Sequence, residues 1–173
     1  MSTNSIFAHL DDLGYACAFL DEIRDVFTAL PLFDGFTAED HGHLCDYLDC
    51  YAAASRTTIL KEGSTGDFLI IVLTGSVSVL KCDIHGHLQH LTQVNPGGFI
   101  GELSLVDGNR RFASCITNEP TDLAVFTRPE LARLMAERPQ LGNKVLLLLL
   151  QLVASRLRET TTQMMLTVVT DLR

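Results

Sequence analysis

The sequence predicts an α+β fold, mainly β, in which an antiparallel β-roll or jelly roll is flanked by N-terminal helices and followed by a long C-terminal helix. Residues 57–127 consist of short β-branched runs separated by Gly, Pro and Asn turn signals, a texture typical of antiparallel rolls. On both sides of this segment apolar residues recur every three or four positions, as they do in helices. The 173 residues, 47% of them hydrophobic and 20% charged, suffice for one globular domain.

Two helices are predicted before the β segment. Apolar residues recur at helical spacing from Phe19 to Leu30, and Pro31 ends the pattern. A second helix is predicted after Thr37, because Thr37 followed three residues later by Asp40 resembles an N-cap with an acidic first turn. We therefore expect the first third of the chain, to about Tyr51, to be helical.

The β segment contains runs of residues that we expect to form strands. Residues 76–80 alternate between Ser and apolar side chains, as in a strand with one buried face. Glycine-containing turn signals separate the runs. The predicted strands are FLIIVL, SVSVLK, HLQHLTQV, ASCIT and LAVFT.

Two helices are predicted after the β segment. The first opens at Arg128-Pro129-Glu130 and ends at Pro139, and a longer helix then runs nearly to the C-terminus. A helix that is apolar on nearly every face must be covered on several sides, so we expect a homodimer through residues 141–170. The alternative is that the apolar stripe packs entirely within one chain. The stripe follows spacings of 4, 3, 4, 3 and 4 through Leu146, Leu150, Val153, Leu157, Thr160 and Met164.

These patterns divide the chain into three parts. We expect an N-terminal helical extension over residues 1–30. Residues 31–138 should form the β-roll with its flanking helices, and residues 139–173 the long dimerisation helix.

The composition excludes several classes of function. A net charge of −8 and a pI near 5.1 argue against direct nucleic-acid binding, which needs clustered Lys and Arg. The N-terminus carries acidic residues where a secretory signal has basic ones, which indicates a cytoplasmic protein. The longest apolar run, Val145–Leu150 extended to Ala154, is too short to cross a membrane. No nucleophile elbow, P-loop or zinc-protease motif is present, so we do not expect an enzyme.

The histidines and cysteines do not predict a metal site. On a helix, His41 and Cys45 share one face while His43 does not, so too few ligands converge for zinc. The His85-Gly86-His87 sequence falls in a predicted hairpin turn, where histidine is common. Five cysteines without a CxxC pair indicate reduced thiols rather than a disulfide framework.

The segment from Phe99 to Thr117 carries the groups that a cyclic phosphate and its ribose require. Gly98 and Gly101 permit close approach of the backbone, and a helix beginning at Gly101 would direct its first amides at an anion. Glu102 supplies a carboxylate for a sugar hydroxyl, and Arg111 a guanidinium that can grip a phosphate through two donors. The alternative is a buried structural ion pair between Glu102 and Arg111.

The letters FIGELSLVDGNRRFAS resemble the phosphate-binding cassette of the cyclic-nucleotide-binding domain family, in which Phe-x-Gly-Glu-Leu precedes Arg, a small residue, Ala and Ser or Thr. The resemblance implies a ribose contact at Glu102 and a phosphate contact at Arg111. Arg110 competes by register, but it would leave Ala113 out of place. The ligand-binding residues implied within the cassette are Ile100, Gly101, Glu102, Leu103, Ser104, Arg111, Phe112 and Ala113.

The flanks also resemble this family, and most closely the sensor domain of catabolite-activator (Crp/Fnr-type) regulators. That resemblance implies a β-roll from about Leu30 to Leu157 and a long dimer helix. It places Thr160 and Thr161 at the adenine, one from each subunit. The alternative for Thr160 is a polar residue that only sets the register of the helix pair.

The resemblance implies a sensor for cyclic AMP, with cyclic GMP as the second choice, and no metal. The chain stops where such regulators continue into a helix-turn-helix, so we expect it to signal through an effector protein of unknown identity. If it is a fragment, the sensor would instead control a missing DNA-binding domain. Phe112 departs from the family, which has a small residue there. This predicts an alternative class, an interaction module whose phosphate pocket is filled by Phe112 and which binds no nucleotide.

Overall fold

The computed structural model describes residues 7–171. Residues 1–6 and 172–173, at the ends of the predicted helical extension and dimer helix, lie outside the described residues, as does the side chain of Met164. The strands are β1 (Asp11–Tyr15), β2 (Asp49–Ala53), β3 (Thr58–Leu60), β4 (Phe68–Val72), β5 (Val77–Cys82), β6 (Leu88–Val94), β7 (Phe99–Ile100), β8 (Ser114–Thr117) and β9 (Thr121–Thr127). The α-helices are α1 (Leu20–Thr28), α2 (Ala38–Cys45), α3 (Glu102–Asp107), α4 (Arg128–Glu137) and α5 (Pro139–Asp171), with 3₁₀ turns η2 (Ala16–Phe19) and η3 (Pro31–Phe33).

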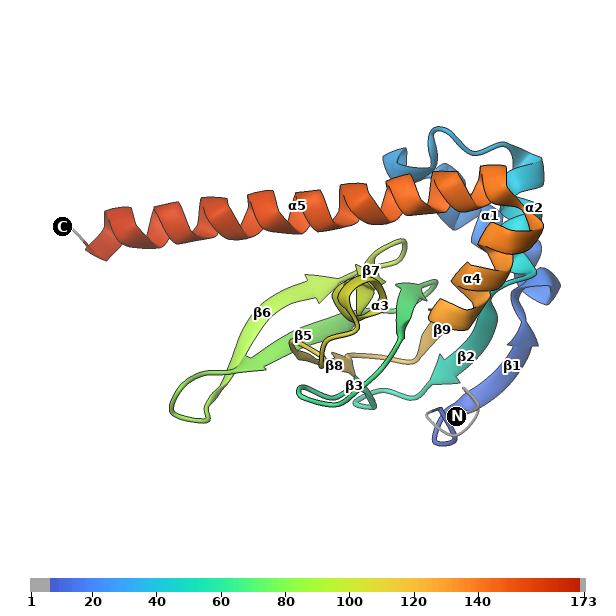
Figure 1. Cartoon of the computed structure of the whole chain (residues 1–173). Coiled ribbons are helices and arrows are strands. Elements are labelled where there is room, and N and C mark those ends of the chain that lie inside the picture. The colour runs from blue at the N-terminus through green and yellow to red at the C-terminus, as the bar shows by residue number, and fades with distance from the viewer. Residues whose placement is uncertain (1–6, 172–173) are drawn as a thin grey trace.

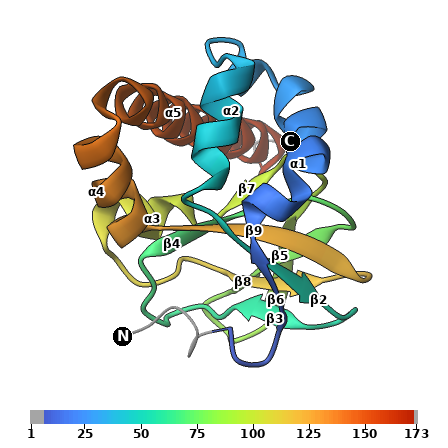
Figure 2. The same cartoon turned by 90° about the vertical axis from the view of Figure 1, so that its right-hand side faces the viewer.

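The strands form two antiparallel sheets that face each other. One sheet has five strands in the order β1-β2-β9-β4-β7, and the other has four in the order β3-β8-β5-β6. Helices α1, α2, α4 and α5 gather on the outer side of the five-stranded sheet (Figure 2). The predicted α+β fold, an antiparallel roll with flanking helices, is confirmed.

Two apolar clusters hold these layers together. Strand β4, which lies between β9 and β7, is buried at every position, because one of its faces meets the second sheet and the other meets the helices. Ile70 and Val72 pack between the sheets with Val77 of β5, whereas Leu69 and Ile71 pack under the helices. The continuous apolar run FLIIV therefore belongs to a doubly covered strand, as its composition indicates.

Several predicted elements are confirmed. Thr37 Oγ1 accepts a hydrogen bond from the Asp40 amide at 3.1 Å, and Asp40 Oδ2 accepts one from the Thr37 amide at 2.8 Å, which makes a capping box at the start of α2. The predicted helix over 19–30 corresponds to α1, and the helix opening at Arg128 to α4. All five predicted strand runs contain strands, namely β4, β5, β6, β8 and β9.

The prediction that the first third is helical is wrong for two segments. Residues 11–15 form β1, which pairs with β2 at the edge of the five-stranded sheet. Four of the five residues of β1 are exposed, so this edge strand lacks the apolar alternation by which a strand is recognised. The second segment is β2 itself, which begins at Asp49. The three-part division of the chain remains a prediction.

The long helix α5 spans 33 residues and projects beyond the roll toward its C-terminal end (Figure 1). Its first half packs on the domain through buried side chains such as Val145 and Leu149, while Leu147, Leu150 and Leu157 are exposed. None of the helices within residues 7–171 has the length and apolar character needed to cross a bilayer.

Candidate functional site

Arg111 is the most unusual side chain of the predicted cassette. It is only 3% exposed, and its guanidinium lies 4.1 Å from the centre of the Phe68 ring. Nη1 donates a hydrogen bond to the Gly101 carbonyl oxygen at 2.8 Å, whereas Nη2 has no hydrogen-bond partner among the described residues. Burial lowers the pKa of Arg111 to about 10, so the group keeps its positive charge at neutral pH.

A buried cation with an unsatisfied donor is costly to keep. Within residues 7–171 Arg111 forms no salt bridge, and the carboxylate of Glu102 is bonded to a different arginine. The alternative of a Glu102–Arg111 ion pair therefore does not hold in this structure. Nη2 of Arg111, which has no partner among the described residues, is suited to an anion that enters from outside the chain.

Two glycines make room for the guanidinium. A Cβ atom on Gly66 would lie 2.7 Å from Nη2 of Arg111, and one on Gly101 would lie 2.5 Å from Nη1. Gly101 also has φ of +79° at the start of α3, a left-handed conformation that other residues rarely adopt. The glycines of the sequence pattern thus serve the close packing of Arg111 as well as the turn.

Glu102 is the first residue of α3 and is 5% exposed. Its Oε1 accepts a hydrogen bond from Nε of Arg156 at 3.2 Å, and Nη2 of Arg156 donates to the Phe99 carbonyl oxygen at 3.0 Å. Arg156 lies on α5, so the long helix reaches the cassette directly. Sequence reasoning missed Arg156, although an arginine one turn before Thr160 in a mainly apolar helix was a signal that could have identified it.

The remaining predicted residues of the cassette differ in exposure. Ile100, Ser104 and Ala113 are buried, whereas Leu103 is partly exposed. The hydrogen bond from Arg111 to the Gly101 carbonyl joins the predicted residues 100–104 to residues 111–113.

Phe112 turns away from the guanidinium. Its neighbours Arg111 and Ala113 are buried, while Phe112 is 59% exposed. Its ring lies 4.4 Å from Nζ of Lys81, which also donates to the Phe112 carbonyl oxygen at 2.7 Å. The alternative in which Phe112 fills the phosphate pocket is therefore wrong for this structure, because residues 112 and 113 form a bend that leaves the Phe112 ring exposed against Lys81.

Arg110, the competing residue by register, is exposed, and Nη1 donates to the Gly63 carbonyl oxygen at 2.8 Å. It lies at the surface, and Arg111 is the buried cation. The geometry thus separates two neighbouring arginines that the sequence alone distinguishes only through the position of Ala113.

Thr160 and Thr161 are exposed on α5 beyond the cassette. Thr161 Oγ1 donates to the Leu157 carbonyl oxygen at 2.8 Å, and Thr160 lies one helical turn after Arg156. Thr160 therefore shares a helix face with the residue that contacts Glu102. Adenine recognition by these threonines remains a prediction.

No metal site accompanies this arrangement in the part of the chain that is described. Three or more His, Cys, Asp or Glu side chains do not group there closely enough to hold an ion. His41 is instead buried among the rings of Phe27, Phe33 and Phe36.

Comparison with known proteins places the cassette in context. The family model described as "Cyclic nucleotide-binding domain" matches residues 52–138. The chain is 30% identical over 129 residues to the cyclic AMP receptor protein of Thermus thermophilus, covering 75% of this chain and 58% of that protein. It is 28% identical over 118 residues to a cAMP-dependent protein kinase regulatory subunit of Aspergillus fumigatus, covering 68% of this chain and 26% of that protein. The chain thus spans about three fifths or less of the length of these two relatives.

Solved structures agree with the sequence comparison. A cyclic nucleotide-binding domain from Methylobacillus flagellatus matches with a TM-score of 0.84 and 40% identity, covering 93% of this chain and 90% of that one. The catabolite activator protein of Thermus thermophilus matches with a TM-score of 0.70 and 28% identity, covering 79% of this chain and 62% of that one.

Proposed function

Because the chain belongs to the cyclic nucleotide-binding domain family, with relatives of the catabolite-activator type, we propose that it is a sensor that binds cyclic AMP and transmits occupancy through α5. The single observation that carries the proposal is the buried guanidinium of Arg111, whose Nη2 lacks a partner within the described residues. A cyclic phosphate would supply the missing acceptor and a compensating negative charge.

The sugar belongs beside Glu102. A carboxylate accepts hydrogen bonds from hydroxyl groups, and Glu102 is buried at the start of α3. Its partner Arg156 would have to share Glu102 with a ribose hydroxyl or move aside. Either response acts on α5, which is how we propose that binding reaches the rest of the protein.

Adenine is the base that we propose, with cyclic GMP as the alternative ligand. Relatives named for cyclic AMP support this choice, and they include both a receptor protein and kinase regulatory subunits. We propose that Thr160 and Thr161 meet the base, one residue from each subunit of a homodimer formed through residues 141–170. The exposed Leu147, Leu150 and Leu157 of α5 support such a pairing, since a second helix would cover them.

The output of the sensor is an effector protein or a DNA-binding domain that lies beyond this sequence. The chain spans 58% of a receptor protein and 26% of a kinase regulatory subunit, so its relatives carry further segments. We do not propose direct nucleic-acid binding by this acidic domain, nor catalysis. A cytoplasmic location remains the expectation from sequence.

Isothermal titration calorimetry with cyclic AMP and cyclic GMP tests the proposal. We expect heat of binding with cyclic AMP and a weaker response to cyclic GMP. The absence of heat with both nucleotides would contradict the sensor function and favour an interaction module that binds no nucleotide, although Phe112 does not fill its pocket in this structure.

A further inference from the structure

We propose that Arg128 is a positioning residue that ties the cassette helix α3 to α4, so that a shift of α3 on nucleotide binding reaches α4 and α5. This inference rests on the proposed nucleotide site. Arg128 lies outside the cassette and touches neither Glu102 nor Arg111; among the residues predicted to bind the ligand it meets only the backbone carbonyl of Ser104 within the described residues. Its role follows from contacts of both its side chain and its backbone.

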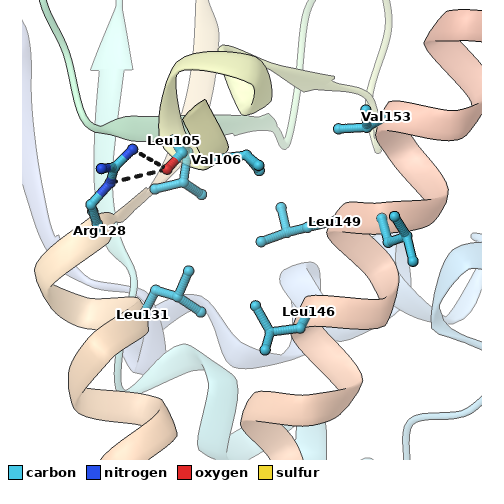
Figure 3. Close-up of a pocket in the computed structure, with 8 residues that line it drawn as sticks. Leu105, Val106, Arg128, Leu131, Leu146, Leu149 and Val153 are labelled. Carbon is cyan, nitrogen blue, oxygen red and sulfur yellow. Dashed lines mark hydrogen bonds between the residues drawn. The ribbon is translucent and has the colours of Figure 1, made fainter. Parts of the chain in front are cut away.

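The side chain of Arg128 caps the C-terminal end of α3. Nε donates to the Leu105 carbonyl oxygen at 3.0 Å, and Nη2 donates to the same oxygen at 2.6 Å (Figure 3). Nη2 also donates to the Ser104 carbonyl oxygen at 3.1 Å. The Leu105 carbonyl belongs to the last turn, where carbonyls lack partners within the helix, whereas the Ser104 carbonyl also accepts from the Gly108 amide at 3.0 Å. A cation at this end also matches the helix dipole. The planar guanidinium can bridge two adjacent carbonyls, which a single ammonium cannot do as well.

Helix α3 is short enough to move as a unit. It has six residues between Gly101 and Gly108, both in the left-handed conformation. Glu102 stands at one end and the carbonyls held by Arg128 at the other. A Cβ on Gly108 would lie 3.3 Å from Nη1 of Arg128, so the guanidinium packs closely on that turn as well. A displacement at the Glu102 end therefore reaches Arg128 through a single turn of helix.

The backbone of Arg128 is tied to the other half of the site. Its amide donates to the Asp67 carbonyl oxygen at 2.7 Å. The neighbours of Asp67 are Gly66 and Phe68, which line the guanidinium of Arg111. Arg128 thus connects the residues around Arg111, which we propose binds the phosphate, with the helix that carries Glu102, which we propose binds the ribose.

On its other side Arg128 is the first residue of α4, which continues into α5. Between α3, α4 and α5 lies an apolar groove of about 460 Å³ (Figure 3). Leu105 and Val106 of α3 face Leu131 of α4 and Leu146 and Leu149 of α5 across it. Apolar packing therefore leaves space into which α3 could shift without moving α5. The hydrogen bonds from Arg128 to the carbonyl oxygens of α3 would instead cause α4 to move with α3.

The competing explanation is that Arg128 only stabilises the end of α3. In that case its removal would lower stability but leave the response of α5 to nucleotide intact. The two explanations are separated by hydrogen exchange, followed by mass spectrometry, over residues 141–153 of α5 with and without cyclic AMP. The variants are Arg128→Met, Arg128→Lys and the control Arg133→Met. Arg133 is also on α4 but donates to the Asp46 carbonyl oxygen, away from α3.

In the wild type and in Arg133→Met we expect cyclic AMP to change exchange over residues 141–153 by about threefold or more. In Arg128→Met we expect binding about tenfold weaker and, at saturating nucleotide, loss of that change. Arg128→Lys should give an intermediate response, and it serves as the test if Arg128→Met does not fold. A wild-type response of α5 in every folded Arg128 variant, at saturation, would overturn the positioning role alone. Failure of the wild type to bind would overturn the proposed function and this inference with it.

Discussion

Nε of Arg156 lies 3.2 Å from Oε1 of Glu102, which joins the long helix α5 to the first residue of α3. The same guanidinium donates to the Phe99 carbonyl oxygen, so α5 contacts the residues on both sides of the glycine turn. Glu102 is buried while Arg156 is half-buried. The helix proposed for dimerisation and signalling thus already contacts the carboxylate proposed for the ribose.

Removal of Arg156 should destabilise the domain. Arg156→Met leaves a buried carboxylate without its partner, which we expect to cost on the order of 1–3 kcal/mol in the free energy of unfolding. Urea denaturation monitored by circular dichroism measures this change. The exposed Arg158 of the same helix provides the control, and Arg158→Met should stay within about 0.5 kcal/mol of wild type. Equal stability of the two variants would show that the Arg156–Glu102 contact contributes little.

Gly66 offers a test that separates affinity from stability. A methyl group there would meet Nη2 of Arg111 at 2.7 Å, and the guanidinium at the end of a flexible side chain can move aside. We therefore expect Gly66→Ala to keep its melting temperature within a few degrees. Its affinity for cyclic AMP should nevertheless fall about tenfold or more, because the Arg111 guanidinium that we propose binds the phosphate is displaced.

The matched control for that variant is Gly35→Ala, since a Cβ on Gly35 meets nothing within 4 Å. Its affinity should equal that of the wild type in the same calorimetric titration. Undiminished binding by Gly66→Ala would argue that Nη2 does not contact the ligand.

The burial of His41 predicts a loss of stability in mild acid. Burial lowers the pKa of His41 below its usual value of 6.5, and the charge of nearby Arg24 lowers it further, while Asp40 opposes the shift. The folded protein therefore takes up this proton at lower pH than the unfolded chain does. The effect is absent well above pH 6.5, and stability falls as the pH drops below that value, by at most about 1.4 kcal/mol per pH unit.

Urea denaturation between pH 7.5 and about pH 5 checks this dependence. His41→Phe places another ring among Phe27, Phe33 and Phe36 and should flatten the slope. His43→Gln leaves the buried ring in place and should retain it. An unchanged slope in His41→Phe would assign the pH dependence to other groups.

Leu157 tests the proposed homodimer. It is 68% exposed on α5, one residue after the arginine that contacts Glu102. A charge buried at a helix pair is costly, so Leu157→Asp should convert a dimer into a monomer in sedimentation velocity experiments. Ile84, which is 95% exposed in the β5–β6 turn, provides the control Ile84→Asp. A monomeric wild type, or a dimeric Leu157→Asp, would contradict pairing through this stretch of α5.

Local signals were predicted well from the sequence. The capping box at Thr37 depends on two residues close in the chain, and it is present. Strands β4, β5, β6, β8 and β9 are marked by β-branched runs and glycine turns, whereas the short strands β3 and β7 were not among the predicted runs. Strand β1 was missed because its exposed residues are held mainly by pairing with β2, a partner distant in the sequence.

The candidate site likewise combines residues predicted from a local motif with residues brought in from distant parts of the sequence. Glu102 and Arg111 lie within one continuous motif, so the pattern alone brings them together. Arg156 and Arg128 reach the cassette from helices distant from α3 in the sequence, and their contacts depend on how α4 and α5 pack. No spacing within the cassette predicts those contacts. The orientation of Phe112 is likewise not predicted by spacing, because it depends on the bend at residues 112 and 113. Arg111 and Ala113 are buried there while the Phe112 ring is exposed.

The adjacent arginines 110 and 111 provide the most direct test of the proposed site. Arg111 is buried with an unpartnered Nη2 in the described structure, whereas Arg110 is exposed. Isothermal titration calorimetry compares the affinities of Arg111→Met and Arg110→Met for cyclic AMP. We predict that Arg111→Met weakens binding by about 100-fold or more, while Arg110→Met changes it by less than about threefold. Equal affinities of the two variants, or a larger loss in Arg110→Met, would contradict the assignment of Arg111 to the phosphate.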